Sequence, residues 1–315
     1  MTLAFLALGA ALLVLPGLGV LRLDRLGPGY WSWLAATSLR AGLGLAQVAL
    51  ALGAAPTLLR ATGVPDAAAL CHRIFGSLGP ETAVAGWLSA AASAWVLLAR
   101  TANRARRRRL RERATIEPWI GEHTVVEGVE AVRIPVLATL AYAIPGRRPQ
   151  VVTSEGLHRL LTPEELDAVV RHELSHLAHG HDRPLALASA VEAVFGGRGP
   201  AARSAANLRL ALERVADEDA GPVVPGRDHL RAALAKAAGR GGPDPAAVLP
   251  AFAPLDTVTH RLEALATAST GTHWPARALA SLPVLATMAT AAMVVATWSL
   301  AAHHQVLGLS TICLT

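Results

Sequence analysis

The chain has 315 residues, of which 52% are hydrophobic and only 17% are charged, and its formal net charge is +6. Soluble domains carry about 25% charged residues, so this composition argues against an ordinary soluble protein and favours one with membrane spans. The length allows about two domains. The basic charge leaves anionic lipid or nucleic acid as partner classes.

Uncharged apolar blocks occur in four places. Three of them precede residue 100, at 2–21, 41–59 and 82–99, and the fourth covers 278–302. A helix needs about 20 apolar residues to cross a bilayer. The first block lacks the preceding basic residues of a secretory signal, so we expect it to be retained as a span. The sequence therefore predicts a mainly α membrane protein with four transmembrane helices.

Arginines predict the orientation of these spans. Eight of them follow the third block, from Arg100 to Arg113. Positive residues beside spans stay in the cytoplasm, so the segment 100–277 is predicted to be cytoplasmic and both termini extracytoplasmic in the cell membrane. The run from Arg104 to Arg113 is expected to bind anionic lipid. No direct nucleic-acid contact is expected, because no aromatic residues interleave with the arginines.

The chain has two cysteines, Cys71 and Cys313. In this topology Cys71 lies in an extracytoplasmic loop, 60–81, and Cys313 in an extracytoplasmic tail, 303–315. A disulfide between them is therefore one alternative, since disulfides persist outside the cytoplasm. Two free thiols are the other, and the sequence does not favour either.

Segment 100–277 is expected to begin as a basic juxtamembrane linker and to continue as an α+β domain inserted between spans three and four, large enough for one core. Thr162, Pro163 and Glu165 predict a capped helix start, and that helix should end at Gly180. The strand QVVTS is a candidate for edge pairing with a substrate, against the alternative of ordinary sheet structure. The expected elements are strands at 129–136, 139–144 and 150–154 and later helices at 201–220, 227–239 and 260–266.

A His-Glu-x-x-His pattern lies on the capped helix. His172 and His176 are four residues apart, so both imidazoles lie on one helix face and can bind one zinc ion. Glu173 is placed to act as general base on a water at the metal. The pattern also arises by chance in His-rich chains, so the zinc site needs a third ligand nearby.

The next predicted helix offers that ligand. Glu213 is the candidate, and Asp217 can orient a zinc-ligating histidine, against the alternative of a solvated acidic face. Arg261 is a candidate to stabilise the oxyanion of the reaction, against the alternative of a structural salt bridge. His179 and His181 fit the end of the motif helix better than the metal, because polar and positive groups are favoured there.

The block from Pro149 to Pro184 resembles the core of integral-membrane gluzincin peptidases, which include HtpX-type, CAAX-processing and BlaR/MecR-type enzymes. The shared features are the strand at 150–154, the turn Glu155-Gly156-Leu157, the helix start at 162–166, the His-Glu-x-x-His and the later Glu-x-x-x-Asp. The resemblance covers residues 135–266. It implies a gluzincin-type zinc peptidase domain with one Zn²⁺ per chain.

The predicted span layout refines this resemblance. The HtpX-type layout has two spans followed by the zinc domain. A layout with three spans before the domain and one after it resembles the BlaR/MecR type. Only residues 303–315 follow the fourth block, so the chain resembles a short form without the penicillin-binding sensor domain. The resemblance implies cleavage of a cytoplasmic winged-helix repressor of the BlaI/MecI kind in signal transduction. A quality-control protease of the HtpX kind and a non-catalytic zinc-binding membrane receptor are the alternatives.

Overall fold

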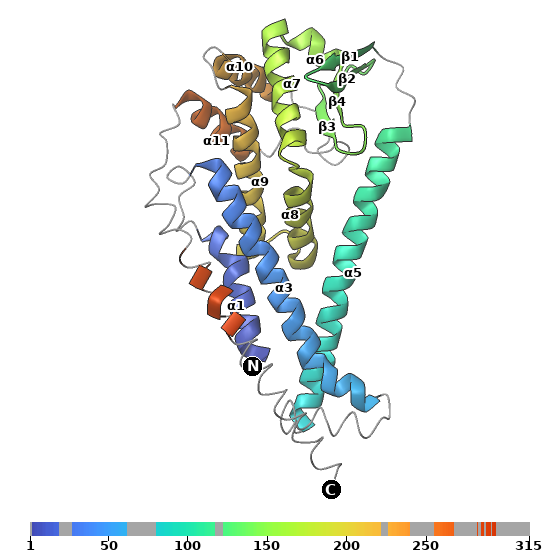
Figure 1. Cartoon of the computed structure of the whole chain (residues 1–315), viewed down its shortest axis with the longest axis vertical. Helices are drawn as coiled ribbons and strands as arrows, with labels where there is room; N and C mark the ends of the chain where they lie inside the picture. The colour runs from blue at the N-terminus through green and yellow to red at the C-terminus, as the bar shows by residue number, and fades with distance from the viewer. Residues whose placement is uncertain are drawn as a thin grey trace.

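The computed structural model describes residues 2–18, 27–61, 80–116, 122–221, 226–239 and 255–267, with single residues between 282 and 293. Helices predominate among them, and one small sheet lies at the end of the molecule where the metal-binding motif is found (Figure 1). The predicted fourth span at 278–302 falls largely outside the described residues, as do the loop 62–79, Cys71 and Cys313.

Three helices make up the first part of the chain: α1 (Thr2–Val14), α3 (Pro28–Ala61) and α5 (Pro80–Ile116). Among the described residues, two segments are long and apolar enough to cross a membrane, Pro28–Ala55 in α3 and Val84–Ala105 in α5. They contain most of the predicted spans 41–59 and 82–99, and α5 continues without a break through the basic residues that the sequence predicted to form a linker. Figure 1 shows α3 and α5 in contact at one end and diverging toward the sheet.

The first predicted span is shorter than its apolar block of 20 residues. α1 has 13 residues and is continued by the 3-10 turn η1 (Leu15–Gly17). Pro16 lies within the first turn of η1, and its missing N–H does not allow the α-helical hydrogen bonds to continue. At 1.5 Å per residue α1 rises about 20 Å, which is less than the roughly 30 Å of a bilayer core.

The four strands form one mixed sheet in the order β1-β2-β4-β3. The strands are β1 (Glu122–Val126), β2 (Val129–Ile134), β3 (Ala141–Ile144) and β4 (Gln150–Ser154). β4 pairs parallel with β2 on one side and antiparallel with β3 on the other. The prediction that QVVTS offers an edge to a substrate is therefore wrong, because both edges of β4 are occupied. The strand at the end of the sheet that contacts the motif helix is β3.

The helices described between the sheet and residue 267 are α6 (Glu155–Leu160), α7 (Pro163–Ala178), α8 (Asp182–Phe195), α9 (Gly199–Ala220), α10 (Gly226–Gly239) and α11 (Leu255–Ala266). α7 is the predicted motif helix. Its capping box is confirmed, since Glu165 N–H donates to Thr162 Oγ1 at 3.3 Å and Thr162 N–H donates to Glu165 Oε2 at 2.9 Å. α8 was not predicted. Pro184 lies in its first turn, where the backbone N–H of any residue has no partner within the helix, so a proline is tolerated there.

Gly156 lies where α6 passes close to the chain that precedes β3. A Cβ atom at this position would lie 2.0 Å from the carbonyl oxygen of Leu137. We expect Gly156→Ala to destabilise the fold by about 1–3 kcal/mol, because backbone has to move to relieve the overlap. Gly146→Ala is the matched control, since nothing lies within 4 Å of its Cβ position. Thermal unfolding of both variants would check this, and equal stability of the two would contradict the close approach.

The capping residue Glu165 also forms an ion pair across the fold. Lys236 Nζ, on α10, lies 2.7 Å from each carboxylate oxygen of Glu165. Burial alone would raise the pKa of Glu165, but the bonds from Lys236 and from the backbone of Thr162 outweigh it and lower this pKa. A carboxyl group whose pKa is lowered by folding stabilises the fold above its unfolded pKa, about 4.3, and that contribution is lost as the pH falls through its folded pKa.

We therefore expect Lys236→Met to lower stability at pH 7 by about 1 kcal/mol, a value discounted for the partial exposure of the lysine. The variant should also lose part of the acid dependence of unfolding below about pH 4. Unfolding midpoints measured from pH 3 to pH 7 would check both effects. Arg231→Met, which removes an exposed ion pair with Asp228 on the same helix, is the control and should change neither.

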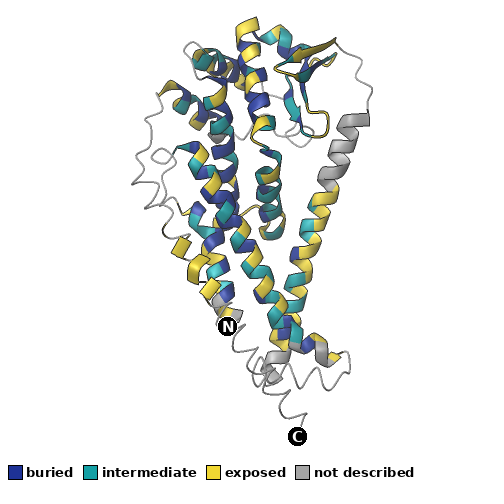
Figure 2. Ribbon diagram, in the orientation of Figure 1, coloured by how far each residue is buried: buried dark blue, intermediate teal, exposed yellow. Residues whose placement is uncertain are grey.

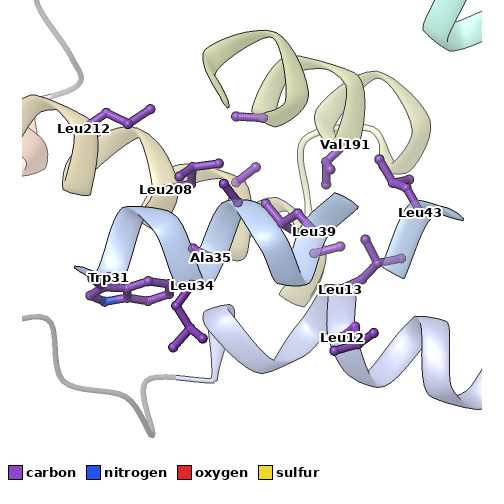
Figure 3. Packing of buried hydrophobic residues seen from close by; sticks show 14 residues of the cluster. Leu12, Leu13, Trp31, Leu34, Ala35, Leu39, Leu43, Val191, Leu208 and Leu212 are labelled. Carbon is purple, nitrogen blue, oxygen red and sulfur yellow. The ribbon is translucent and has the colours of Figure 1, made fainter. Parts of the chain in front are cut away.

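The largest buried apolar cluster joins the first part of the chain to the hairpin formed by α8 and α9. Leu12, Leu34 and Leu39 from α1 and α3 pack with Val191 of α8 and Leu208 of α9 (Figure 3). In Figure 2, α9 is largely buried, whereas much of α5 is exposed. α1 and α3, which contain parts of the first two predicted spans, thus share one core with α9, the helix predicted to hold Glu213.

Candidate metal centre

α7 presents His172 and His176 on the side that faces α9. The amphipathic pattern predicts this placement, because the apolar residues Val170 and Leu174 pack against the sheet residue Val151. His172 Nε2 and His176 Nε2 lie 3.2 Å apart. Both rings are largely shielded from solvent, as expected for ligands projecting from neighbouring turns of one helix.

α9 brings a carboxylate to these two nitrogens. Glu213 Oε2 lies 3.4 Å from His172 Nε2, and Glu213 Oε1 lies 3.6 Å from His176 Nε2. One possible ligand atom from each of His172, His176 and Glu213 lies within 4.8 Å of the other two. The predicted ligands His172, His176 and Glu213 are therefore brought together, although Glu213 is 37 residues after His176 in the chain.

The spacing of these donor atoms fits zinc. Ligand atoms about 2.0–2.1 Å from a tetrahedral zinc ion are separated by about 3.3–3.4 Å. The two imidazole nitrogens lie 3.2 Å apart, and one carboxylate oxygen of Glu213 lies 3.4 Å from His172 Nε2 and the other 3.6 Å from His176 Nε2. Two imidazoles and one carboxylate are also the donor set of a catalytic site that keeps a fourth position open.

Arg261 and Asp217 form a buried ion pair beside the three donors. Arg261 Nε donates to Asp217 Oδ2 at 2.8 Å and Arg261 Nη2 to Asp217 Oδ1 at 2.5 Å. Arg261 Nη1 lies 3.0 Å from Glu213 Oε2. The guanidinium is 1% exposed, so the salt bridge expected as the alternative for Arg261 is present. Its role toward an oxyanion stays a prediction.

Asp217 lies beside the first histidine, although the predicted hydrogen bond from the ring is not formed. Its Oδ1 lies 3.0 Å from His172 Nδ1, an ion-pair contact in which the ring N–H is not aligned for a hydrogen bond. The contact places a carboxylate behind the ring, on the side away from Glu213. An acidic residue in this position holds the ring so that Nε2 points at the metal.

The charges of the centre shift the pKa values of its members in opposite directions. Burial lowers the pKa of His172, but the carboxylates of Asp217 and Glu213 outweigh it and raise this pKa to about 9. Burial and the neighbouring His172 lower the pKa of His176 to about 4. Burial opposes ionisation of Glu213, yet Arg261 and both histidines hold its pKa well below the usual range. Without metal, one proton on His172 therefore neutralises part of the acidic charge.

Glu173 points toward β3 and borders an apolar pocket. The backbone N–H of Ala143 in β3 hydrogen-bonds its carboxylate. Burial, more than any neighbour, raises the pKa of Glu173 to about 7. The pocket brings Glu173 together with His172 and Arg261, and its apolar wall comes from α7 and α10, including Val169, Leu230, Ala233 and Leu234.

His181 belongs to the centre, although the sequence analysis assigned it to the helix end. Its Nδ1 lies 2.9 Å from His176 Nδ1, and the residue is 4% exposed. Gly180 adopts a positive φ of 60°, which turns the chain so that His181 returns beside His176. In the sequence, Gly180 was the one sign that the chain turns at this point. His179 does lie at the helix end, exposed and bonded to Asp219 at 2.7 Å.

The remaining predicted residues can be placed only in part. Arg104 is exposed on α5, but the side chains from Arg106 to Arg113 lie outside the described residues, as do Cys71 and Cys313. The predicted lipid contact and the disulfide therefore stay predictions.

Comparison with known proteins identifies one family. Residues 122–209, from β1 to the middle of α9, match the model of peptidase family M48. No curated protein and no solved structure shows a significant match to this chain. Members of this family are zinc-dependent metalloproteases, and the matched segment contains two of the three metal donors together with Glu173. The match therefore supports a place for this chain among the zinc metallopeptidases.

Proposed function

We propose that the protein is a membrane-bound zinc endopeptidase whose ligands are His172, His176 and Glu213 and whose general base is Glu173. The convergence of the three donor atoms beside a buried glutamate carries this proposal. The candidate spans in α3 and α5 support the attachment to a membrane. The arginines that follow the third apolar block support a peptidase part that faces the cytoplasm.

Zinc, when bound, would supply the Lewis acidity that activates water and polarises the scissile carbonyl. Glu173 accepts the proton from the attacking water and passes it to the leaving amine. A general base works best when its pKa lies near the operating pH, and burial raises the pKa of Glu173 in that direction. Arg261 neutralises Glu213 and Asp217, so the two carboxylates stay ionised and in position for the histidines.

An extended substrate would bind along β3. This strand ends the sheet and contacts α7, and Ala143 at its centre already bonds Glu173. Backbone pairing at such an edge holds a peptide extended across the catalytic group.

The proposed substrate is a cytoplasmic winged-helix repressor of the BlaI/MecI kind, which makes the enzyme a signalling peptidase of the short BlaR/MecR type. The resemblance of the motif block and the predicted span layout support this choice. A second candidate is quality control of membrane proteins. The two candidate spans before the zinc region favour it, because the HtpX-type layout also has two spans there.

The full chain in detergent micelles with zinc, offered a purified repressor or casein, separates these functions. Cleavage of the repressor that is lost in Glu173→Gln supports the signalling peptidase. Cleavage of casein alone supports quality control. Zinc binding without any cleavage would contradict both and leave a non-catalytic receptor.

A further inference from the structure

His176 has a different environment at each of its two ring nitrogens. Nε2 faces His172 Nε2 at 3.2 Å and Glu213 Oε1 at 3.6 Å, so this nitrogen is the one available to a metal. Nδ1 faces away from that point and lies 2.9 Å from His181 Nδ1. The two rings meet edge to face at a centroid distance of 4.9 Å. His181 is therefore the hydrogen-bond partner of a proposed ligand.

The two histidine ligands are supported by unlike groups. His172 has a carboxylate, Asp217, behind its Nδ1, whereas His176 has a buried imidazole, that of His181, in that position. A metal-bound imidazole carries its proton on the other nitrogen, and the acceptor of that proton fixes both the tautomer and the orientation of the ring. If Nε2 of His176 binds zinc, Nδ1–H of His176 must donate, and Nδ1 of His181 must accept.

The position of His181 is itself well determined. Its backbone N–H donates to the carbonyl oxygen of His176 at 3.0 Å, and its carbonyl accepts from Leu185 N–H at 3.0 Å in the first turn of α8. Because the backbone is bonded on both sides, the Cα atom of His181 is held beside His176 at the start of α8.

We propose that His181 is a positioning residue that accepts a hydrogen bond from Nδ1–H of His176 and so presents Nε2 of His176 to the zinc ion. This inference rests on the proposed zinc site and adds to it a residue outside the His-Glu-x-x-His motif. His181 does not bind the metal, since its partner is the nitrogen of His176 that faces away from the other donors.

Zinc affinity, measured on the purified full chain by competition with a chromophoric chelator, tests this role without any need for a substrate. His181→Phe keeps a ring but offers no acceptor, so its zinc Kd should rise roughly 10–100-fold, as for other outer partners of metal ligands. His181→Asn places an amide oxygen close to the position of Nδ1 and should stay well within tenfold of the wild-type Kd. His179→Ala removes the exposed neighbouring ring and should leave the Kd unchanged.

The absorption bands of the Co²⁺-loaded protein give a second measurement, because they report the geometry of the ligands. They should change in His181→Phe and not in His179→Ala. If His181→Phe does not fold, His181→Gln, whose amide reaches the position of Nε2 instead, replaces it with the same expected loss of affinity. Equal Kd values for folded wild type and His181→Phe, or for His181→Phe and His181→Asn, would overturn the inference. A wild-type chain that binds no zinc would instead overturn the proposed function.

Discussion

Glu173→Gln is expected to reduce peptide hydrolysis by about 10²–10⁴-fold, the usual contribution of a general base. The amide keeps the size of the side chain and can still accept from the backbone N–H of Ala143, but it cannot take a proton from water. The zinc content should stay at the wild-type level, because the three donors are on other residues. Turnover of a cleaved substrate and metal analysis of the same preparation would measure both.

Glu164→Gln is the matched control for this experiment. It makes the same chemical change in the same helix at an exposed position, and activity should be retained. Hydrolysis by Glu173→Gln at the wild-type rate would exclude Glu173 as the base. Loss of zinc from this variant would mean that the glutamate supports the site in another way.

Arg261→Met is expected to destabilise the metal-free protein by about 3–5 kcal/mol, the cost of leaving a buried ion pair without one partner. The carboxylates of Asp217 and Glu213 would then repel each other. Protonated His172 would be the nearest positive group left to them. For a domain of this size, the loss corresponds to a fall in Tm of roughly 6–20 °C. Thermal unfolding of the metal-free chain in detergent would measure it.

Zinc should restore part of this loss, because a divalent ion beside Glu213 replaces the missing positive charge and stabilises the state that binds it. The Tm difference between wild type and Arg261→Met is therefore expected to narrow when zinc is added. Arg171→Met is the control; it removes exposed ion pairs from α7 and should cost below about 1 kcal/mol. A zinc-independent Tm difference would argue that Arg261 acts on the fold and not on the charge of the centre.

The ligands could be predicted from the sequence because local rules govern them. Helical spacing puts His172 and His176 on one face, and the chemistry of zinc requires a third donor, which the pair Glu213 and Asp217 supplies. The capping box of α7 is equally local. The structure brings these residues together as predicted.

Other features depended on contacts that no short pattern contains. β4 lies inside the sheet because β2 and β3 both pair with it, and the order of strands is set by the whole domain. The place of His181 followed from the left-handed turn at Gly180, which separates it from the helix on which it was expected. The end of α1 at Val14 could not be predicted from hydropathy, because the apolar block continues beyond Pro16.

The core shared by α1, α3, α8 and α9 has a practical consequence for any fragment of this protein. A shortened chain that starts at residue 117 keeps every proposed metal ligand, yet it uncovers the apolar face of α9 at Leu208 and Leu212. Glu213 follows that face on the same helix. Such a fragment should aggregate on expression and bind zinc poorly, because the first hundred residues complete the fold around its third ligand as well as attaching it to a bilayer.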